Sequence, residues 1–433
     1  MTFDEFRTKH PVFTYNGYKY ELSNNELHIQ FDFQIGNDIR FEPKMVLQPG
    51  KHARWPEDLK QLDAIVFNIG MIELISYWKC TCSPIIHIKP YKLNDDQQLW
   101  WAKLYWNGLG EFCYKNNIHC EFQDFLEFTF NVSAPQLTGT GIPRTEDSQR
   151  VIVPIGGGKD SVVTLEDLRT QRDVVPFIIN PRGATIDCAR IAGFENPEEI
   201  IVLKREISQK LLELNKEGYL NGHTPFSAML AFYSTLLSAV TGIRDVALSN
   251  ESSANEPTIP GTYINHQYSK SLEFEEDFRQ YVRDHMSDCN HYYSHLRALT
   301  ELQIAEKFAT HPAYFKVFKS CNAGSKENKW CCNCPKCLFA YIILSPFIGD
   351  ATMIDIFGED LLNKPELEQY FDELTGMSRN KPFECVGTIR EVNTALRMIC
   401  SSRADKYLIK HYINKTLESL EEGMLDEYYN MAP

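Results

Sequence analysis

A glycine-rich loop between an apolar run and a helix start carries the clearest chemistry in this chain. Residues 151–155 are apolar and mostly β-branched, which predicts a buried strand. The loop follows and consists of Gly156, Gly157, Gly158, Lys159, Asp160 and Ser161. Glycines let backbone N–H groups approach an anion, and the start of a helix favours negative charge. The sequence therefore predicts a phosphate site at this loop.

The loop departs from two common phosphate motifs. Asp160 does not fit G-x-x-x-x-G-K-[ST], and Ser161 stands where G-x-G-x-x-G needs its last glycine. The loop resembles the Ser-Gly-Gly-x-Asp-Ser loop of the PP-loop ATP pyrophosphatases, with Gly156 in the place of the first serine. This resemblance implies that Gly156 to Ser161 bind ATP with Mg²⁺, that ATP is split into AMP and pyrophosphate, and that Lys159 offsets the pyrophosphate charge. An ordinary strand–helix turn is the alternative.

Four cysteines have the spacing of metal ligands. They follow the pattern C-x9-C-x2-C-x2-C, with Cys332 left over, and are Cys321, Cys331, Cys334 and Cys337. Four thiolates suit tetrahedral zinc, and C-x2-C steps are common zinc knuckles. Similar spacing holds a structural zinc in 7-cyano-7-deazaguanine synthase, another PP-loop enzyme. We therefore expect a structural zinc, with buried thiols as the alternative.

Polar residues follow several predicted strands, where doubly wound sheets bind their ligands. Two long polar loops are the simpler interpretation, but dense hydrogen-bonding side chains also suit a polar substrate. The residues that we expect to contact substrate are Asn180, Arg205, Asn250, Glu251, Asn265, Gln267 and Ser269.

Six segments, taken in order, resemble one family. They are 156–161, 221–225, 249–254, 265–271, 334–337 and 381–388. They are similar to the UDP-N-acetyl-α-D-muramoyl-L-alanyl-L-glutamate epimerases of bacterial peptidoglycan synthesis. The resemblance implies ATP-dependent conversion of the terminal L-glutamate of a UDP-muramoyl dipeptide to D-glutamate through an acyl adenylate.

Such an epimerase needs groups that move a proton at Cα. The candidates within these segments are His223, His266, Lys270 and Cys385, and the sequence does not rank them. Two other functions remain open at this point. One is a PP-loop enzyme of deazapurine or tRNA modification, and the other is a non-catalytic zinc module that binds a partner.

The whole chain suits an enzyme built around such a loop. Its 433 residues predict an N-terminal α+β domain (1–145), an α/β catalytic domain (150–345) and a helical C-terminal region (346–433). We expect the second to be a doubly wound parallel sheet of the PP-loop, adenine nucleotide α hydrolase-like type. A formal charge of −14 argues against a nucleic-acid partner.

The chain shows no sign of export or membrane insertion. Its first residues have neither a basic nor an apolar signal region, and the uncharged span 224–243 contains enough Ser, Thr and Pro to be a buried helix. We therefore expect a cytoplasmic protein that binds a small-molecule substrate, with no membrane partner.

Overall fold

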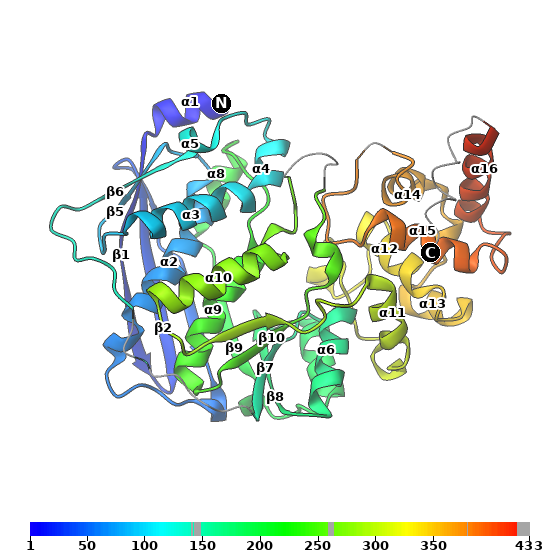
Figure 1. Cartoon of the computed structure of the whole chain (residues 1–433), viewed down its shortest axis with the longest axis horizontal. Helices are drawn as coiled ribbons and strands as arrows, with labels where there is room; N and C mark the ends of the chain where they lie inside the picture. The colour runs from blue at the N-terminus through cyan, green and yellow to red at the C-terminus, as the bar shows by residue number, and fades with distance from the viewer. Residues whose placement is uncertain (140–141, 143–148, 259–263, 379, 422–433) are drawn as a thin grey trace.

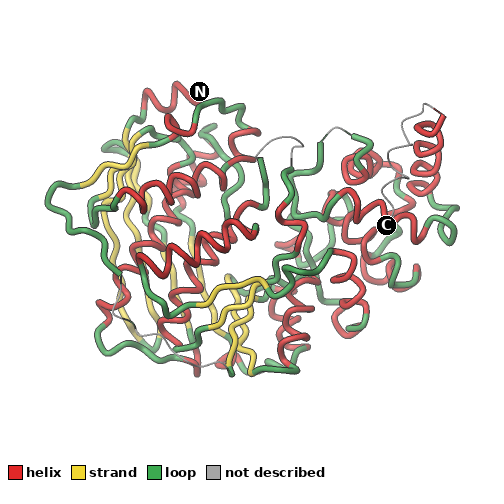
Figure 2. Tube along the Cα trace, viewed as in Figure 1, coloured by secondary structure: helices red, strands yellow, loops and turns green. Residues whose placement is uncertain are grey.

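The structure is a computed structural model that describes residues 1–139, 142, 149–258, 264–378 and 380–421 (Figure 1). Its described strands form one sheet of eleven strands. Helices cover both faces of this sheet, and the helices at the end of the chain form a group beside one end of it (Figures 1 and 2). The chain therefore has the α/β architecture that the sequence predicts.

Five of the strands are parallel and carry the glycine loop. Their order across the sheet is β11-β10-β7-β8-β9. If these five strands are numbered 1 to 5 along the chain and the sheet is read from β9 to β11, their order is 3-2-1-4-5, which is the doubly wound pattern. The order reverses between β7 and β10, so the carboxyl ends of these two strands are where a ligand site is expected. The strands are β7 (Arg150–Pro154), β8 (Asp173–Ile179), β9 (Ile201–Glu206), β10 (Asp245–Leu248) and β11 (His291–Ser294).

Both faces of the parallel strands are buried. Along β7, Val151 and Val153 pack into one core, and Ile152 packs into the other. The first core contains side chains of α6 (Lys159–Arg169), α7 (Gly183–Ile191) and α11 (Glu301–Ala309). The second contains α9 (Phe226–Thr241) and α10 (Leu272–His285). Burial on both faces explains why β7 is a continuous apolar run.

The uncharged span 224–243 is confirmed as a buried helix, because it forms α9 with nearly all of its side chains inside the second core. None of the helices in the described part of the chain combines the length and apolar character needed to cross a bilayer.

The N-terminal strands continue the same sheet. Strand β4 pairs antiparallel with β9, with Leu47 opposite Leu203, so the sheet runs without a break from the first part of the chain into the second. These strands are β1 (Val12–Ser23), β2 (Glu26–Ile35), β3 (Ile39–Phe41), β4 (Lys44–Gln48), β5 (Ile85–Ile88) and β6 (Glu127–Phe130). The Pro- and Gly-containing sequence of residues 133–149 predicts a linker, and eight of its residues, 140–141 and 143–148, lie outside the described residues.

Helices of the N-terminal part pack on this sheet. The apolar stretch 65–78 forms most of a helix, α2, which packs against α9 in the second core. The helices are α1 (Phe3–Lys9), α2 (Asp63–Trp78), α3 (Asp95–Gly108), α4 (Gly110–Lys115) and α5 (Phe122–Phe125). Helix α8 (Gln209–Lys216), from the second part of the chain, also packs there, against β3.

The last part of the chain is helical, as its amphipathic pattern predicts. Its helices pack on one another and on α11, at the end of the molecule far from β1 (Figure 1). They are α12 (Pro335–Leu344), α13 (Asp350–Phe357), α14 (Glu368–Thr375), α15 (Ile389–Ile399) and α16 (Tyr407–Glu421).

A buried ion pair ties the N-terminal helix α2 to the parallel strands. The guanidinium of Arg205 on β9 donates two hydrogen bonds to Glu73 of α2, at 2.6 and 2.8 Å. The hydroxyl of Tyr233 on α9 donates to the same carboxylate at 2.5 Å. The side chain of Glu73 is fully buried, and that of Arg205 is 11% exposed. Because both charges are largely removed from water, each is stabilised by the other.

We expect Glu73→Ala to destabilise the protein strongly, because it leaves the Arg205 guanidinium buried without a counter-ion. The expected loss is about 3–5 kcal/mol in the free energy of unfolding. Glu199→Ala, which removes an exposed partner of Lys51, should cost less than about 1 kcal/mol. Urea unfolding of the two variants checks this, and equal small losses would contradict it.

Candidate active site

The glycine loop connects β7 to α6 at the carboxyl edge of the parallel strands. Gly157 has a φ of +82°, and a Cβ at this position would lie 2.9 Å from the Cβ of Ala184. Only glycine fits this turn without strain. Gly158 is the N-cap residue of α6. Because the first turn of a helix leaves its N–H groups without acceptors inside the helix, this turn can bind an anion.

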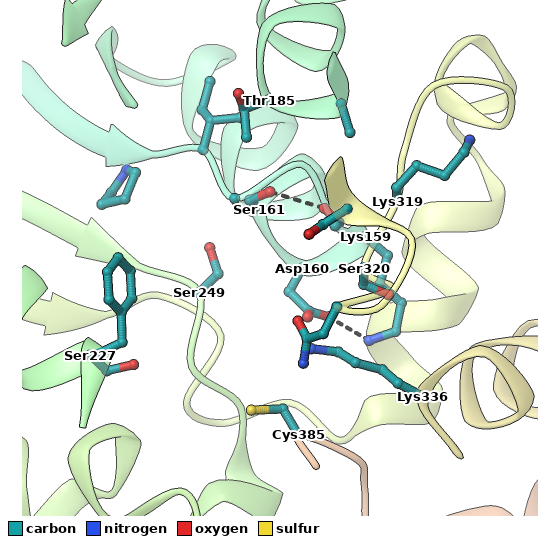
Figure 3. A pocket seen from close by; sticks show the side chains of 18 of the residues that line it. Lys159, Asp160, Ser161, Thr185, Ser227, Ser249, Lys319, Ser320, Lys336 and Cys385 are labelled. Carbon is teal, nitrogen blue, oxygen red and sulfur yellow. Dashed lines mark hydrogen bonds and ion pairs between the residues drawn. The ribbon is translucent and has the colours of Figure 1, made fainter. Parts of the chain in front are cut away.

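A cavity of about 400 Å³ opens from this loop (Figure 3). It lies at the ends of β7 and β10, where the strand order reverses, and residues from α7, α9, α11 and α12 complete its wall. The predicted loop residues that line it are Gly156, Gly158, Lys159, Asp160 and Ser161. The remaining loop residue, Gly157, accepts a hydrogen bond from the backbone N–H of Lys319 at 2.8 Å.

Lys159 is engaged in ion pairs within the protein. Its ammonium contacts the carboxylates of Asp160 and Glu301, and its side chain is only 7% exposed. The charge of Lys159 is therefore balanced before any ligand binds. Arg182 and Lys336 also line the cavity, as does Lys319, whose ammonium donates to the backbone carbonyls of Lys316 and Phe318.

Three carboxylates meet at the same wall of the cavity. They belong to Asp160, Glu251 and Glu301. Burial raises the pKa of the Glu301 carboxyl, and Asp160 and Glu251 add to this effect, while Lys159 opposes it. Two ammonium groups face these carboxylates, because Lys159 pairs with Asp160 and Glu301, and Lys270 interacts with Glu251 and Asp160. Carboxylate oxygens are the ligands that Mg²⁺ prefers, so this wall fits a magnesium ion brought in with a phosphate ligand.

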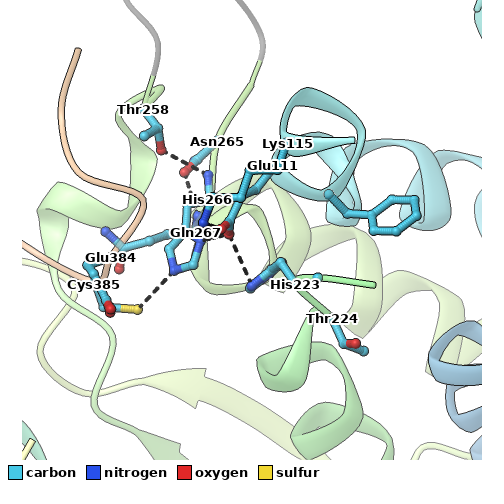
Figure 4. A network of polar contacts seen from close by, with 12 residues as sticks. Glu111, Lys115, His223, Thr224, Thr258, Asn265, His266, Gln267, Glu384 and Cys385 are labelled. Atoms are coloured by element: carbon cyan, nitrogen blue, oxygen red, sulfur yellow. Dashed lines mark hydrogen bonds and ion pairs between the residues drawn. The ribbon is translucent and has the colours of Figure 1, made fainter. Parts of the chain in front are cut away.

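A second polar cluster stands behind the far end of the cavity (Figure 4). The Nε2 atom of His266 lies 3.8 Å from the sulfur of Cys385, and its Nδ1 atom is hydrogen-bonded to the carboxylate of Glu111. The Nδ1 atom of His223 lies 3.4 Å from the same Glu111 oxygen. Of these four residues, Cys385 lines the cavity, so the cluster opens into it through the sulfur.

The cluster favours a charged thiolate and a charged imidazole. Burial opposes ionisation of Cys385, but the ammonium of Lys270 and the hydrogen bond with His266 lower the thiol pKa to about 6. Burial also opposes a charge on His266, whereas its contacts with Cys385 and Glu111 raise the His266 pKa to about 9. Burial and the nearby His266 lower the pKa of His223 to about 3. Near pH 7, Cys385 is therefore an anion, His266 a cation and His223 neutral.

The structure brings together all four residues predicted to move a proton. Lys270 lines the cavity, and its ammonium interacts with the sulfur of Cys385. Burial opposes its charge, but Cys385 and Glu251 raise the pKa of Lys270 above its ordinary value. Lys270 is therefore an ammonium in this structure.

The residues predicted to contact substrate divide into three groups. Asn250 and Glu251 line the cavity. Asn265, Gln267 and Ser269 lie in the segment that holds His266 and Lys270, and the amide of Asn265 bonds to the backbone of Ala254 and Gln267. The other two lie elsewhere. Asn180 bonds to both backbone groups of Arg205, and Arg205 is paired with Glu73 in the core.

The four predicted cysteine ligands converge on one point. The sulfur atoms of Cys321, Cys331, Cys334 and Cys337 all lie within 4.8 Å of one another, and those of Cys331 and Cys337 are 3.7 Å apart. Four sulfurs at 2.3 Å from a zinc ion are about 3.8 Å apart in a tetrahedron. The left-over cysteine, Cys332, points away and lies 3.1 Å from the carbonyl of Phe357. The four residues fit zinc, as their spacing predicts.

The cysteine cluster adjoins the cavity. Cys321 belongs to the cluster and also lines the cavity. Lys336, which stands between Cys334 and Cys337, faces the cavity from the start of α12 (Figure 3). The segment before Cys321 is the one whose backbone bonds to Gly157. A metal held here would fix the wall of the cavity that faces the glycine loop.

Sequence reasoning missed two acidic residues of the site. Glu111 lies in the N-terminal part, where the sequence shows no catalytic signature, and Glu301 begins α11. The available signal for Glu111 was an acidic residue inside the mostly apolar run 109–114. A carboxylate that ends up buried on such a helix needs a partner from elsewhere in the fold.

A doubly wound sheet with reactive side chains gathered at one cavity defines an α/β enzyme. The family model described as the MurL N-terminal domain matches residues 5–295, and the one described as the MurL C-terminal domain matches residues 317–426. The first contains every described strand, and the second contains the four clustered cysteines. No solved structure matches the chain.

Three curated relatives are each named UDP-N-acetyl-α-D-muramoyl-L-alanyl-L-glutamate epimerase. The Salinispora tropica protein is 32% identical over 90% of this chain and 84% of its own length. The Xanthomonas oryzae pv. oryzae protein is 34% identical over 82% of this chain and 79% of its own length. The Micromonospora sp. protein is 32% identical over 90% of this chain and 86% of its own length. The chain belongs to this epimerase family and is an isomerase.

We expect purified protein to contain about one zinc per chain, because four thiolates normally retain the metal. Cys334→Ser should lower both the zinc content and the Tm. Cys332→Ser is the matched control and should leave both unchanged, since its sulfur points out of the cluster. Elemental analysis and thermal unfolding measure the two effects. Wild-type protein that is free of metal and equally stable would exclude the zinc site.

We expect alkylation of Cys385 by iodoacetamide to rise with pH around a midpoint near 6, because the thiolate is the reactive form. His266→Ala should move this midpoint upward, since it removes a contact that lowers the thiol pKa. Cys400 is an internal control, because burial raises its thiol pKa. Peptide mass spectrometry after timed alkylation separates the two cysteines. A Cys385 profile that coincides with that of Cys400 would refute the assignment.

Proposed function

We propose that the chain converts the terminal L-glutamate of UDP-N-acetylmuramoyl-L-alanyl-L-glutamate to D-glutamate, in the synthesis of peptidoglycan precursors. The family relationship and one structural observation support this. A single cavity begins at a glycine loop suited to phosphate and ends at the cluster of Cys385, His266 and Glu111. Membership of the epimerase family favours this function over a deazapurine or tRNA modification enzyme.

We infer that the reaction requires activation of the substrate carboxylate. Removing a proton from a carbon beside a carboxylate places a second negative charge next to the first. Conversion of the carboxylate to an acyl adenylate removes the first charge and lets the carbonyl accept the electrons. ATP would supply this activation and leave as AMP and pyrophosphate.

The residues at the glycine loop fit such a nucleotide of the PP-loop type. Gly156 to Gly158 and Ser161 would receive the phosphates, and Lys319 and Lys336 add positive charge on the facing wall. Asp160, Glu251 and Glu301 would hold Mg²⁺, which offsets the phosphate charge. Lys159 keeps two of these carboxylates in place through its ion pairs.

At the far end of the cavity, the protein would act on the Cα of the glutamyl residue. His266 and Lys270 each contact the sulfur of Cys385 there, and protons can be exchanged through it. Glu111 fixes the ring of His266 through its Nδ1 atom. The Nδ1 atom of His223 lies 3.4 Å from the same carboxylate. The rings of His223 and His266 are neighbours, with their centres 4.5 Å apart. ATP and UDP-linked sugars are cytoplasmic compounds, so we expect the protein to act in the cytoplasm.

The direct test is incubation of the protein with ATP, Mg²⁺ and the UDP-muramoyl dipeptide in D₂O. We expect D-glutamate in the product, solvent deuterium at its Cα, and release of AMP and pyrophosphate. Omission of ATP should abolish deuterium incorporation, because the unactivated Cα–H is too weakly acidic. Deuterium exchange that proceeds equally without ATP would refute the activation step, and ADP as the product would refute adenylation.

We expect Asp160→Asn to reduce pyrophosphate release on the order of 10²-fold or more, because it removes a charge that would hold the metal beside the phosphates. Asp167→Asn is the matched control on the same helix. Its carboxylate pairs with Lys307, outside the cavity, and the variant should keep its activity. A coupled pyrophosphate assay compares the two, and equal rates would contradict the role of Asp160.

A further inference from the structure

The residues behind Cys385 form the arrangement of a nucleophilic catalyst. The sulfur lies 3.8 Å from His266 Nε2, and the opposite ring nitrogen of His266 is bonded to Glu111. Nucleophile, base and orienting carboxylate therefore stand in a row. A cysteine that only exchanges a proton with the substrate does not need a histidine oriented by a carboxylate behind it.

The histidine and the carboxylate are held firmly by neighbouring groups. The backbone N–H of His266 donates to the hydroxyl of Thr258 at 3.0 Å, and the second oxygen of Glu111 pairs with Lys115. The carboxylate of Glu111 is 5% exposed, and the ring of His266 is 11% exposed (Figure 4). The ring is thus fixed with Nε2 facing the sulfur, while the sulfur itself faces the cavity.

We propose that Cys385 attacks the activated carbonyl of the substrate, so that the glutamyl residue is carried on the enzyme as a thioester while its Cα is inverted. This step rests on the proposed function, because it needs an acyl adenylate as its electrophile. The adenylating loop and Cys385 line the same cavity, so the acyl group can pass from one to the other without leaving it.

The bonds of this sequence balance without any further reactant. The thiolate of Cys385 forms a bond to the acyl carbon, and the bond from that carbon to the AMP oxygen breaks, which releases AMP. A base removes the Cα proton, the electrons move into the thioester carbonyl, and a proton returns on the other face. Water then adds to the carbonyl, the carbon–sulfur bond breaks, and the product carboxylate and the thiolate are released with two protons.

A thioester suits proton exchange because it combines an acidic Cα–H with a longer lifetime than the adenylate. Sulfur donates its lone pair to the carbonyl only weakly, so the Cα–H of a thioester is more acidic than that of an oxygen ester. Water attacks a thioester more slowly than an acyl phosphate, so the acyl group has time to exchange its proton. The covalent bond also keeps the reactive carbon beside its base.

Acylation of Cys385 also prepares His266 to act as that base. The negative sulfur is one of the contacts that raise the pKa of His266. Once the sulfur is acylated this charge is gone, the pKa of His266 falls, and the ring can release its proton and become a base. The Cα is two bonds from the sulfur, within reach of groups that contact it. Lys270 contacts the same sulfur and is an ammonium that can stabilise the developing negative oxygen.

The test is a rapid acid quench of wild-type protein mixed with ATP, Mg²⁺ and the UDP-muramoyl dipeptide, followed by mass spectrometry. We expect an adduct with the mass of the substrate less one water, on the peptide that contains Cys385. Hydroxylamine should remove it. Cys385→Ala should release pyrophosphate in a single burst, form no adduct, and lose deuterium incorporation at Cα by at least 10²-fold. Cys400→Ser, at a cysteine outside the cavity, should behave as the wild type.

Each outcome has a defined meaning. Formation of D-glutamate within the first turnover with no adduct at any time would overturn the thioester, and so would deuterium incorporation at the wild-type rate in Cys385→Ala. The wild-type measurement does not depend on the folding of any variant. Absence of pyrophosphate release by the wild type would instead refute the adenylation on which the thioester rests, so the two failures can be told apart.

Discussion

The site depends on the pairing of β4 with β9. Five residue pairs, from Lys44 with Glu206 to Gln48 with Val202, join the N-terminal strands to the parallel strands as one sheet. Because the sheet is continuous, α2 and α9 share one core, and the chain around α4 comes to lie beside the segment that holds His266. Without this pairing, Glu111 and Cys385 would belong to separate bodies. The catalytic arrangement is therefore a product of the sheet rather than of any single motif.

The parts of the site that the sequence predicts are those whose chemistry is local. The glycine loop is defined by one strand, one turn and one helix start, and the four cysteines are close together along the chain. The structure agrees with both patterns in detail, including Cys332 as the residue left out. His223, His266, Lys270 and Cys385 were found as candidates through the family resemblance, and the structure gathers them in one place.

The parts that the sequence does not predict depend on contacts between distant segments. The sequence places Arg205 after a strand, as a ligand-binding residue would be, but it lies within β9 and its partner Glu73, 132 positions away, pairs with it in the core. Lys159 lies in the glycine loop, but Glu301, 142 positions away, takes up its charge. Glu111 has only a weak local signal, its place in the mostly apolar run 109–114, because an acidic residue on a short helix is usually exposed. In each case the partner, not the residue type, decides the role.

The continuity of the sheet also limits how this chain can be divided. A fragment beginning at residue 150 would contain the glycine loop, the cysteine cluster and most of the reactive side chains. It would also leave β9 as a bare edge with a row of unpaired N–H and C=O groups, and would expose the apolar face of α9 that α2 covers. Open edges of this kind recruit strands from other molecules. Such a fragment would thus tend to self-associate.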